Sequence, residues 1–398
     1  MRAGKLDSSD NNTGKLSETI PPFNLMPSTV SLFSTDDPVD KLPLVLVPLV
    51  SSAGVRFPKA LGMPRSFISG DNILNGLATR NSLSQKLGCI PGFQTALPPK
   101  DIHNQLREVG AVFFSFRENM NSNSGINPAS QKTPPFPNNL DSLFNHFTSA
   151  LRVSPVNSAV FNIKIGEGSR IQKNQEGRNL AQSLKGVFKR MQIKTSFFLT
   201  DSSQPIGQAV GNSLEIKEAI EILKGSGPLD LLKLALEFGS DMLICVDKTM
   251  SKSEAKKFLK RKILNGDALK KFREIIEAQK GDTRVIDNDS CLPFSTEKTK
   301  IRSSQTGFIQ KINTKKLFSA YLKCVSREGS PADSGNCAIG FVLQKKSGDL
   351  VKKGESLVEV HSTSKISRSW IGDEFDEIFT ISETPPPFQP LIIERIWE

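Results

Sequence analysis

The sequence predicts an α/β protein with a parallel sheet, followed by a region of short strands. Residues 158–200 follow the order strand, helix, strand, which joins parallel neighbours within a sheet. Residues 228–281 contain helices with clear start and stop signals. After about residue 285 the apolar runs become short and turn residues separate them, so a second architecture is expected there.

The amino-terminal quarter is the least regular part of the sequence. Residues 1–29 are polar and show no hydrophobic periodicity, which predicts a disordered tail. Residues 30–60 contain the apolar run 42–50 and are expected to be buried, with helical or mixed structure. Prolines interrupt this run, and it is shorter than the roughly 20 residues that a membrane-spanning helix needs. Residues 62–86 are expected to be irregular.

One helix and one strand are predicted before the first long loop. Apolar residues recur at helical spacing over 99–109, which predicts a helix with one buried face. The apolar run 111–116 predicts a short buried strand. Residues 117–140 are rich in Asn, Ser and Pro, and this composition predicts a loop.

The strand–helix–strand segment is the centre of the predicted sheet. Ser158–Ile165 reads as a strand that ends at Gly166. A helix is expected over 180–192 and a second strand over 193–200. Because a helical crossover joins the two strands, we expect them to be parallel neighbours.

The first of the later helices is predicted to begin at a proline. Pro228 is well placed for the first helical turn, where its missing N–H leaves no hydrogen bond unmade. Leu229, Leu232 and Leu236 recur at helical spacing. We therefore expect these three leucines to form the buried face.

Two further helices carry clear capping signals. Ser251 and Glu254 have capping-box spacing, and Asn265–Gly266 is a typical helix end. Asp267 can cap the next helix, which Gly281 ends. Its predicted buried stripe consists of Leu269, Phe272, Ile275 and Ile276.

The composition restricts the partners that the chain is expected to bind. The formal net charge of +11 attracts anions in general and does not choose between phosphate, nucleotide and nucleic acid. No aromatic stacking pattern accompanies the basic run 256–262, so we interpret it as a solvated helix face. A nucleic-acid partner is therefore not favoured.

The cysteines and histidines favour a reduced compartment. The chain has 5 Cys, an odd number without CxxC spacing, which predicts neither a disulfide framework nor a zinc site. The 3 His are scattered, so no metal cluster is expected. The amino-terminus lacks the apolar core of a signal peptide. These signals predict a cytoplasmic protein without a membrane partner.

Residues 201–227, DSSQPIGQAVGNSLEIKEAIEILKGSG, combine a loop of small residues with an amphipathic helix. In this segment, and in several shorter stretches in the same order, the chain resembles the thymidine and pyrimidine-nucleoside phosphorylase family. The resemblance covers about residues 30–398. The shorter stretches are REVGAVFF (107–114), NIKIGEG (162–168), GDTRVID (281–287), SSQTGFIQ (303–310) and FTISETPPPFQPLIIERI (379–396).

The resemblance implies a fold and a domain division. Residues 30–284 would form a large α/β domain with a mixed sheet, with remnants of a truncated helical domain. Residues 285–398 would form an α+β domain that contains a barrel-sandwich subdomain of the biotinyl type. The pattern at 347–362 resembles half of such a barrel, but the Met-Lys-Met-like context of a carrier lysine is missing. We therefore expect a barrel without a prosthetic group.

The resemblance also implies a pentosyltransferase reaction, which is a glycosyltransferase reaction. Family members cleave the N-glycosidic bond of thymidine or uridine with phosphate, releasing pentose 1-phosphate and the free pyrimidine. Phosphate is then a co-substrate, and no cofactor is implied. The same resemblance implies a homodimer.

The family phosphate loop reads Lys-His-Ser-Thr-Gly-Gly-Val-Gly-Asp-Lys, and this chain retains it only in part. Ser34, Thr35 and Lys41 match and would be its phosphate-binding remnants. Phe33 replaces the histidine, and Leu32 replaces the first lysine. A second family element, Ser-Gly-Arg-Gly-Leu-Gly-His-Thr-Gly-Gly-Thr-Leu-Asp-Lys-Leu-Glu, has no convincing counterpart before the matching exit at 90–93.

The positions of the pyrimidine contacts are also replaced. Pro137 stands at the family arginine, and His146 and Ala150 stand at the serine and the lysine. Arg152 is close enough in sequence to supply a charge, although a structural arginine is the simpler interpretation. No residue of this sequence can therefore be assigned a catalytic role from the family's pattern.

An ion site is the best-preserved part of the family machinery. Some members hold a cation with backbone carbonyls and a glutamate, and Ile206, Ala209 and Glu218 stand at those positions. Either a monovalent cation binds there, or the Lys41 ammonium replaces it and pairs with Glu218. The alternative is that Glu218 is an ordinary exposed helix residue.

Three functional hypotheses remain open. The first is a phosphorylase homologue of impaired activity, a pseudoenzyme that binds a partner, for example as a heterodimer with an active paralogue. The second is an active phosphorylase with rearranged contacts. The third is nucleic-acid binding through the basic charge, which salt-dependent association would reveal.

Overall fold

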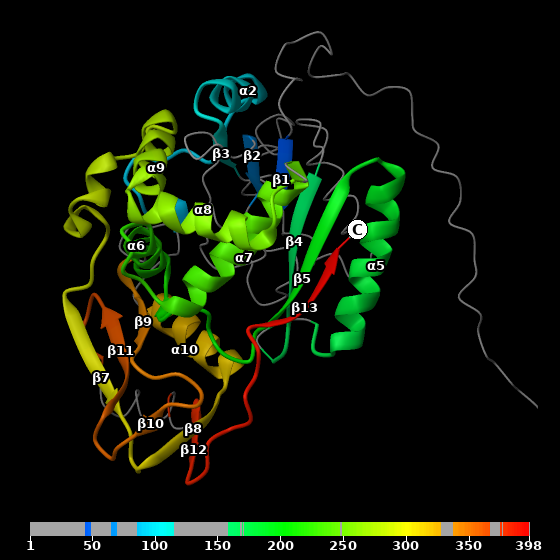
Figure 1. Ribbon diagram of the computed structural model, residues 1–398. Coiled ribbons are helices and arrows are strands. Elements are labelled where there is room, and N and C mark those ends of the chain that lie inside the picture. Colours follow the sequence, from blue (N-terminus) through cyan, green and yellow to red (C-terminus); the bar gives the residue numbers. More distant parts are fainter. Residues whose placement is uncertain are drawn as a thin grey trace, which may run out of the picture. The chain divides into compact units, whose positions relative to one another are not determined.

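The computed structural model describes part of the chain, and two of the described ranges are strands without described side chains (Figure 1). The chain divides into two units, residues 1–34 and 35–398, and every described residue belongs to the second. The residues predicted to form a tail, 1–29, lie outside the described residues. The described residues are 44–48, 65–69, 86–114, 158–167, 169, 171–246, 249–327, 337–366, 375 and 377–397.

The main sheet has six strands in the order β13-β5-β4-β1-β2-β3. Five of them run parallel from β3 to β5, and β13 pairs antiparallel with β5 at one edge. The predicted α/β class with a mixed sheet is therefore confirmed. The strands are β1 (Leu44–Pro48), β2 (Arg65–Ser69), β3 (Ala111–Phe114), β4 (Ser158–Ile165), β5 (Lys194–Asp201) and β13 (Ile392–Trp397).

One face of this sheet packs against two helices. Every residue of β4 is buried, as expected for a central parallel strand that is covered on both faces. Phe161 of β4 stacks on Phe197 of β5, with the ring centroids 4.8 Å apart. Apolar residues of α2 (Pro99–Glu108) and α5 (Asn174–Arg190) belong to the same buried cluster. Figure 1 shows α5 beside β5.

The opposite face packs against four helices. These are α6 (Asn212–Leu223), α7 (Leu229–Val246), α8 (Lys252–Leu264) and α9 (Asp267–Ala278). Phe198 of β5 meets Phe238 of α7 with ring centroids 4.5 Å apart, and Phe272 of α9 is fully buried in the same cluster. This larger cluster is the main core of the described α/β part.

The remaining elements form two small sheets and one helix. The sheets have the orders β10-β8-β12 and β6-β9-β11-β7. α10 (Thr314–Arg327) buries Tyr321 against Phe341 of β9 in the third apolar cluster. The strands are β6 (Ala209–Val210), β7 (Glu297–Arg302), β8 (Gly307–Ile312), β9 (Gly340–Leu343), β10 (Leu350–Val351), β11 (Ser356–Ser362) and β12 (Phe379–Ser382); short 3-10 turns cover Thr283–Ile286 and Asp289–Cys291.

Most element predictions are confirmed, with small shifts at the ends. The predicted helix at 99–109 and the predicted strand at 158–165 correspond to α2 and β4. The capping box of α8 is present, with Ser251 Oγ accepting from Glu254 N and Ser251 N donating to the Glu254 carboxylate. α5 begins at Asn174, six residues before the predicted start, because its first turns are polar and carry no apolar signal.

Two element predictions are wrong. Arg65–Ser69, predicted to be irregular, is a strand, because pairing with β1 and β3 supplies an order that its mixed composition does not indicate. The buried face of α7 is also different. Leu229 is 80% exposed, whereas Leu231 and Leu234 are buried. The helix is apolar on more than one face, and the face that packs into the core is the one that carries Leu231, Leu234 and Phe238.

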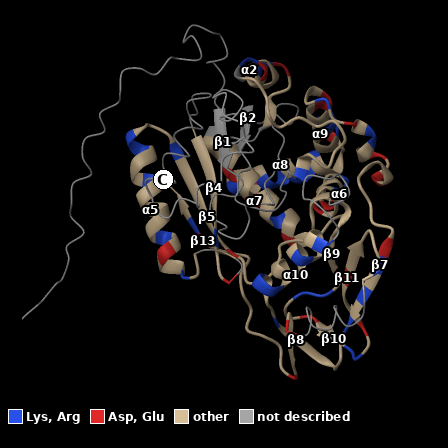
Figure 2. Cartoon of the chain, turned by 180° about the vertical axis from the view of Figure 1, so that it is seen from behind, with Lys and Arg blue, Asp and Glu red and all other residues tan. Residues whose placement is uncertain are grey.

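The basic run 256–262 lies on α8, where Figure 2 marks Lys and Arg residues in blue. Lys257 and Lys260 are exposed. Lys256 pairs with Glu237, and Lys262 pairs with Asp267 at 2.7 Å. These contacts agree with a solvated helix face.

The structure corrects the prediction that the cysteines form no disulfide framework. Cys89 and Cys337 form a disulfide across 248 residues of sequence, with their Cα atoms 5.9 Å apart. No local spacing could indicate this pair, because tertiary packing alone brings the two segments together. Among the described residues, Cys245, Cys291 and Cys324 are not part of a disulfide.

Candidate functional site

Most residues of the predicted site lie outside the described residues. Of the predicted site, the structure describes only the proposed ion-binding positions Ile206, Ala209 and Glu218. The roles assigned to the other positions therefore stay predictions. These positions are Leu32, Phe33, Ser34, Thr35, Lys41, Pro137, His146, Ala150 and Arg152.

The three described positions come together around one tight loop between β5 and α6. Ile206 and Ala209 are each 8% exposed, so the loop is packed rather than free. Gly207 has φ +75°, and a β-carbon there would collide with the Glu218 carboxylate. The loop therefore needs glycine at this position to bring its backbone against the side chain from α6.

Glu218 is a bonded, largely buried carboxylate and not an ordinary exposed helix residue. Its Oε1 accepts hydrogen bonds from Gln208 N at 2.6 Å and Ala209 N at 3.0 Å. Burial raises its pKa to about 7, and the two backbone N–H groups oppose that shift. Nearby Glu215 adds to the rise in pKa, whereas Lys346 lowers it. A cation next to this group would favour its ionised form.

A lysine from the loop between β9 and β10 supports the same loop. Lys346 Nζ donates to Pro205 O and lies 3.2 Å from Asp230 Oδ2. Asp230 Oδ2 in turn accepts from Gly207 N at 3.1 Å. The sequence could not indicate this cation, because 141 residues separate it from the loop that it contacts.

A second polar group lies at the start of α6, where Lys86 and Glu215 form a buried ion pair. Lys86 is 4% exposed and Glu215 is 9% exposed. Gly211 N also donates to Glu215 Oε1 at 3.3 Å, so the carboxylate charge is engaged from two directions.

Lys164 of β4 adds a second positive group to this ion pair. Its residue exposure is 9%. Burial lowers its pKa to about 7; Lys86 lowers it further, and Glu215 opposes the shift. We name Lys86, Lys164 and Glu215 the lysine centre.

Two polar side chains extend the lysine centre toward α10. Burial raises the pKa of Tyr321, and the charge of Glu215 acts in the same direction. The phenol is hydrogen-bonded to the backbone of Asn212, the first residue of α6. Asn212 Oδ1 is buried and has no hydrogen-bond partner among the groups that the structure describes.

The lysine centre lies where ligands bind in α/β sheets. Lys164 is the penultimate residue of β4 and is in register with Thr200 of β5, so it stands at the carboxyl ends of two parallel strands. Glu215 lies in the first turn of α6, whose amino-terminal end carries a partial positive charge. Crevices at such strand ends are the usual ligand sites of this fold class.

Sequence reasoning did not single out the lysine centre, although signals existed. Lys164 lies in NIKIGEG, and Glu215 lies in the 201–227 segment. Lys86–Leu87 repeats the Lys-Leu pair near the end of the second family phosphate motif. The motifs could have identified each residue as a candidate. The contact between Lys86 and Glu215 could not be predicted, because 129 residues separate them and only the fold brings them together.

Comparison with known proteins identifies relatives across nearly the whole chain. No family model matches the sequence. The pyrimidine-nucleoside phosphorylase of Staphylococcus haemolyticus is 29% identical over 367 residues, which are 92% of this chain and 82% of that protein. Those of Geobacillus stearothermophilus and Bacillus subtilis are 29% and 28% identical over 92% and 90% of this chain and 82% and 80% of their own. Over about nine-tenths of its length the chain is therefore similar to pyrimidine-nucleoside phosphorylases.

A solved structure with weak similarity is anthranilate phosphoribosyltransferase (TrpD) of Thermus thermophilus. It has 12% sequence identity and a TM-score of 0.41, over 60% of this chain and 78% of that one. A similarity this weak shows nothing about the fold or the function of this chain.

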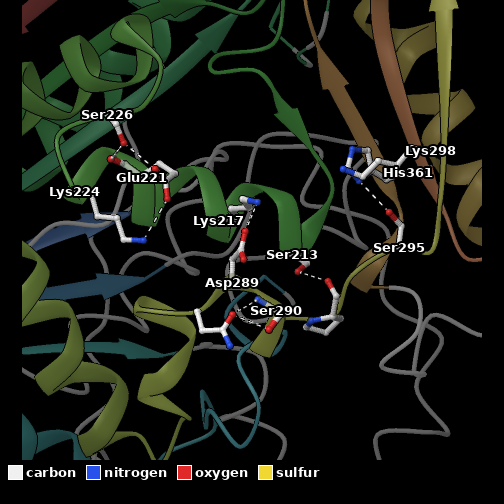
Figure 3. Close-up of polar contacts among 12 residues, drawn as sticks. Ser213, Lys217, Glu221, Lys224, Ser226, Asp289, Ser290, Ser295, Lys298 and His361 are labelled. Carbon is white, nitrogen blue, oxygen red and sulfur yellow. Dashed lines mark hydrogen bonds and ion pairs between the residues drawn. The ribbon is translucent and has the colours of Figure 1, made fainter.

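Contacts from α6 tie the segment that leads into the C-terminal sheets to the α/β part (Figure 3). Ser213 Oγ donates to Pro293 O at 2.7 Å, and Lys217 pairs with Asp289. Within the C-terminal part, His361 Nδ1 on β11 lies 3.0 Å from Ser295 Oγ. Burial and the nearby lysines lower the pKa of His361, whereas Glu359, 2.9 Å from Nε2, opposes this shift.

The structure holds no metal-binding cluster within its described ranges. No group of three or more His, Cys, Asp or Glu side chains there could hold a metal ion. None of the described helices is long and apolar enough to span a membrane.

A third buried polar group, the Asp241 centre, joins β5, α7, α8 and β13. Asp241 is fully buried, and its Oδ2 accepts from Ser196 Oγ at 2.5 Å and Arg395 Nε at 2.6 Å. Its Oδ1 makes no hydrogen bond but lies 3.1 Å from Lys252 Nζ. Arg395 also lies over the Trp397 ring, 4.3 Å from its centroid. Opposite charges therefore surround this carboxylate.

Proposed function

We propose that this chain is a pyrimidine-nucleoside phosphorylase homologue in which phosphorolysis is impaired. The family reaction transfers a pentose from a thymidine or uridine nucleoside to phosphate. The observation that carries the proposal is the replaced phosphate loop. Leu32 and Phe33 stand in place of its lysine and histidine, and Asp36 and Asp37 stand in place of two glycines.

These replacements act against the reaction in three physical ways. Loss of the lysine removes a cation that would neutralise phosphate. The two aspartates add negative charge next to a dianion and restrict a turn that used glycine. Loss of one strong donor to a developing oxyanion lowers the rate by about 10²–10³. Several such losses at once predict a rate far below that of an intact enzyme.

The proposal keeps the rest of the family architecture. The loop at Gly207 and Glu218 supports a site for a monovalent cation, with the Lys41 ammonium as the alternative occupant. We also propose that the two small sheets form a barrel-sandwich without a prosthetic group. The chain would be a cytoplasmic protein that acts as a homodimer or as the non-catalytic subunit of a heterodimer with an active paralogue.

A phosphorolysis assay tests the proposal. Purified protein is incubated with thymidine or uridine, with and without phosphate, and release of the free pyrimidine is measured. We expect no release above that of a Ser34→Ala/Lys41→Ala double variant. Phosphate-dependent release well above the double variant would instead identify an active phosphorylase with rearranged contacts.

A further inference from the structure

Three polar side chains outside the predicted site are arranged as a nucleophile, a base and an acid. Ser295 Oγ lies 3.0 Å from Nδ1 of His361, and Nε2 of the same ring lies 2.9 Å from Glu359 Oε1. Figure 3 shows Ser295 and His361 pointing toward each other. A serine, a histidine and a carboxylate joined by two hydrogen bonds are the chemical parts of a hydrolytic triad. We name these three residues the serine centre.

Strand geometry places the acid and the base on one face of β11. Residues two positions apart in a strand point to the same side of the sheet, so Glu359 and His361 are neighbours. Val358 and Val360 point to the other side and are fully buried in the third apolar cluster. The serine precedes β7, the antiparallel neighbour of β11 in which Lys298 is in register with His361. Paired strands therefore hold the serine centre together.

The hydrogen-bond partners decide which nitrogen of the imidazole carries the proton. Glu359 is a carboxylate in an ion pair, with Lys298 Nζ 3.5 Å from its Oε1. A carboxylate only accepts hydrogen bonds, so Nε2–H of His361 donates to it. In the neutral ring Nδ1 is then unprotonated and accepts from the Ser295 hydroxyl. A general base needs this arrangement in order to take a proton from a serine.

Burial and charge around the serine centre favour a neutral base. His361 is 7% exposed, and burial lowers its pKa below the ordinary value of 6.5. Lys298 and Lys217 lower this pKa further, whereas Glu359 raises it. Ser295 is half-buried, so its hydroxyl is not enclosed in the apolar core. The base is therefore free of a proton near neutral pH, and the nucleophile lies at the edge of the core.

We propose that the serine centre is a hydrolytic site for carboxylic esters, with Ser295 as the nucleophile and His361 as the general base. Glu359 orients the imidazole and is a positioning residue. Phe294, directly before the serine and 66% exposed, offers an apolar contact for a small acyl or aryl group. The activity goes beyond the proposed function, because it uses none of the residues assigned to phosphate, pyrimidine or ion contacts.

The reaction balances with water as the only co-reactant. Ser295 Oγ attacks the ester carbonyl carbon while its proton passes to Nδ1 of His361, which gives a tetrahedral oxyanion. The bond to the alcohol oxygen then breaks, and the imidazolium gives its proton to that oxygen. Water attacks the acyl-serine and loses a proton to Nδ1, and His361 returns this proton to the serine oxygen as the carboxylic acid leaves. Lys298, whose charge already acts on the ring, favours the negative charge of the oxyanion.

Hydrolysis of p-nitrophenyl acetate by the full-length protein tests the site. We expect Ser295→Ala and His361→Gln each to lower kcat/KM by at least about 100-fold, because a positioned general base contributes that much. Ser290→Ala is the matched control and should leave the rate unchanged, since the Ser290 hydroxyl donates to the Asn288 amide oxygen, which is no base. Absence of hydrolysis above the uncatalysed rate, or equal rates for Ser295→Ala and the natural protein, would overturn the proposal.

Covalent labelling of the unsubstituted protein keeps the test valid even if a variant does not fold. Phenylmethylsulfonyl fluoride reacts with a serine that a base activates: the serine oxygen displaces fluoride from sulfur, and the proton passes to the imidazole. We expect mass spectrometry to find the adduct on Ser295 and not on Ser290. Labelling of both serines, or of neither, contradicts an activated Ser295.

The pH dependence of hydrolysis separates the positioning role of Glu359 from a structural one. The charged groups that face the ring are Lys298, Lys217 and Glu359. His361 acts only when neutral, so kcat/KM should rise with pH and level off above the pKa of the ring. Glu359→Gln removes the group that raises this pKa, so the rise should move to lower pH and the plateau should fall. A profile that Glu359→Gln does not move would overturn the role of Glu359. Because phosphate and nucleoside are absent, these tests and the phosphorolysis assay can fail separately.

Discussion

The Asp241 centre and the lysine centre are both buried, but they differ in whether each charged group has an ion-pair partner. Asp241 contacts Arg395 and Lys252 and accepts a hydrogen bond from Ser196, and Lys252 also pairs with Glu237. In the lysine centre, Lys86 pairs with Glu215, whereas Lys164 forms no ion pair among the described residues. Every charge of the first arrangement is therefore paired within the chain. In the second, one lysine is accommodated by a lowered pKa.

This difference separates structural from functional buried charge. A buried pair in which each charge has a partner holds elements together, and removing one partner leaves the other charge stranded. A buried charge without a partner destabilises the fold, and functional sites are where such groups collect. The two centres should therefore respond in opposite directions when their central residue is removed.

The largest effect is expected at the Asp241 centre. Asp241→Ala leaves Arg395 and Lys252 without their buried carboxylate and should destabilise the protein by about 3–5 kcal/mol. Urea unfolding measures this change. Asp289→Ala is the matched control, because Asp289 pairs with Lys217 at the surface and its removal should change stability by less than about 1 kcal/mol. Equal losses in both variants would show that the Asp241 centre is not structural.

Removal of the Lys164 charge should instead stabilise the protein. The pKa of Lys164 is lowered in the folded state, so between pH 7 and the unfolded value of 10.5 the unfolded chain binds more protons. Stability therefore rises with pH across that range. Lys164→Met should be more stable than the natural protein by about 4–5 kcal/mol at pH 6.5.

Urea unfolding at pH 6.5, 8 and 9 follows this difference between the two proteins. Most of the advantage of Lys164→Met should disappear by pH 9, because the natural protein then buries a neutral amine. Lys270→Met, at an exposed position of α9, should show no such pH dependence. A Lys164→Met variant that is less stable than the natural protein at pH 6.5 would mean that Lys164 is a structural residue.

Glu218 should show the opposite pH dependence. Its pKa is raised to about 7 in the folded state, so between pH 4.5 and pH 7 the folded protein binds more protons. The stability that protonation of Glu218 contributes to the folded protein is fully present below pH 4.5 and is lost as the pH rises through 7. Glu218→Gln should therefore match the natural protein at pH 5 and exceed its stability by about 2 kcal/mol at pH 8. A constant difference in urea unfolding at the two pH values would contradict the raised pKa.

The smallest effect is expected at the exposed N-cap of α8, which directly precedes Lys252 of the Asp241 centre. Ser251→Ala removes the N-cap of α8 and should destabilise the protein by about 1 kcal/mol in urea unfolding. Ser183→Ala is the control, since Ser183 is exposed within α5 and Ala is a better helix former. If Ser183→Ala destabilises the protein as much as Ser251→Ala, the loss does not come from the cap.

The predictable parts of this structure are those that local sequence determines. The strand at 158–165 and the cap at Ser251 follow from periodicity and residue type within a few positions. The lysine centre and the Cys89–Cys337 disulfide join segments 129 and 248 residues apart. No local pattern carries that information. Glu218 was found only because the segment around it resembles a known family.

The placement of β13 affects how the chain is made on the ribosome. The sheet edge at β5 is covered by residues 392–397, and the same strand delivers Arg395 to Asp241. Synthesis proceeds from the amino terminus at about 5–20 residues per second, so β5 and Asp241 emerge well before their partners. During that interval a nascent chain exposes an unpaired strand edge at β5, and Asp241 lacks Arg395. Because synthesis starts at the amino terminus, this sheet can be completed only after β13 has left the ribosome.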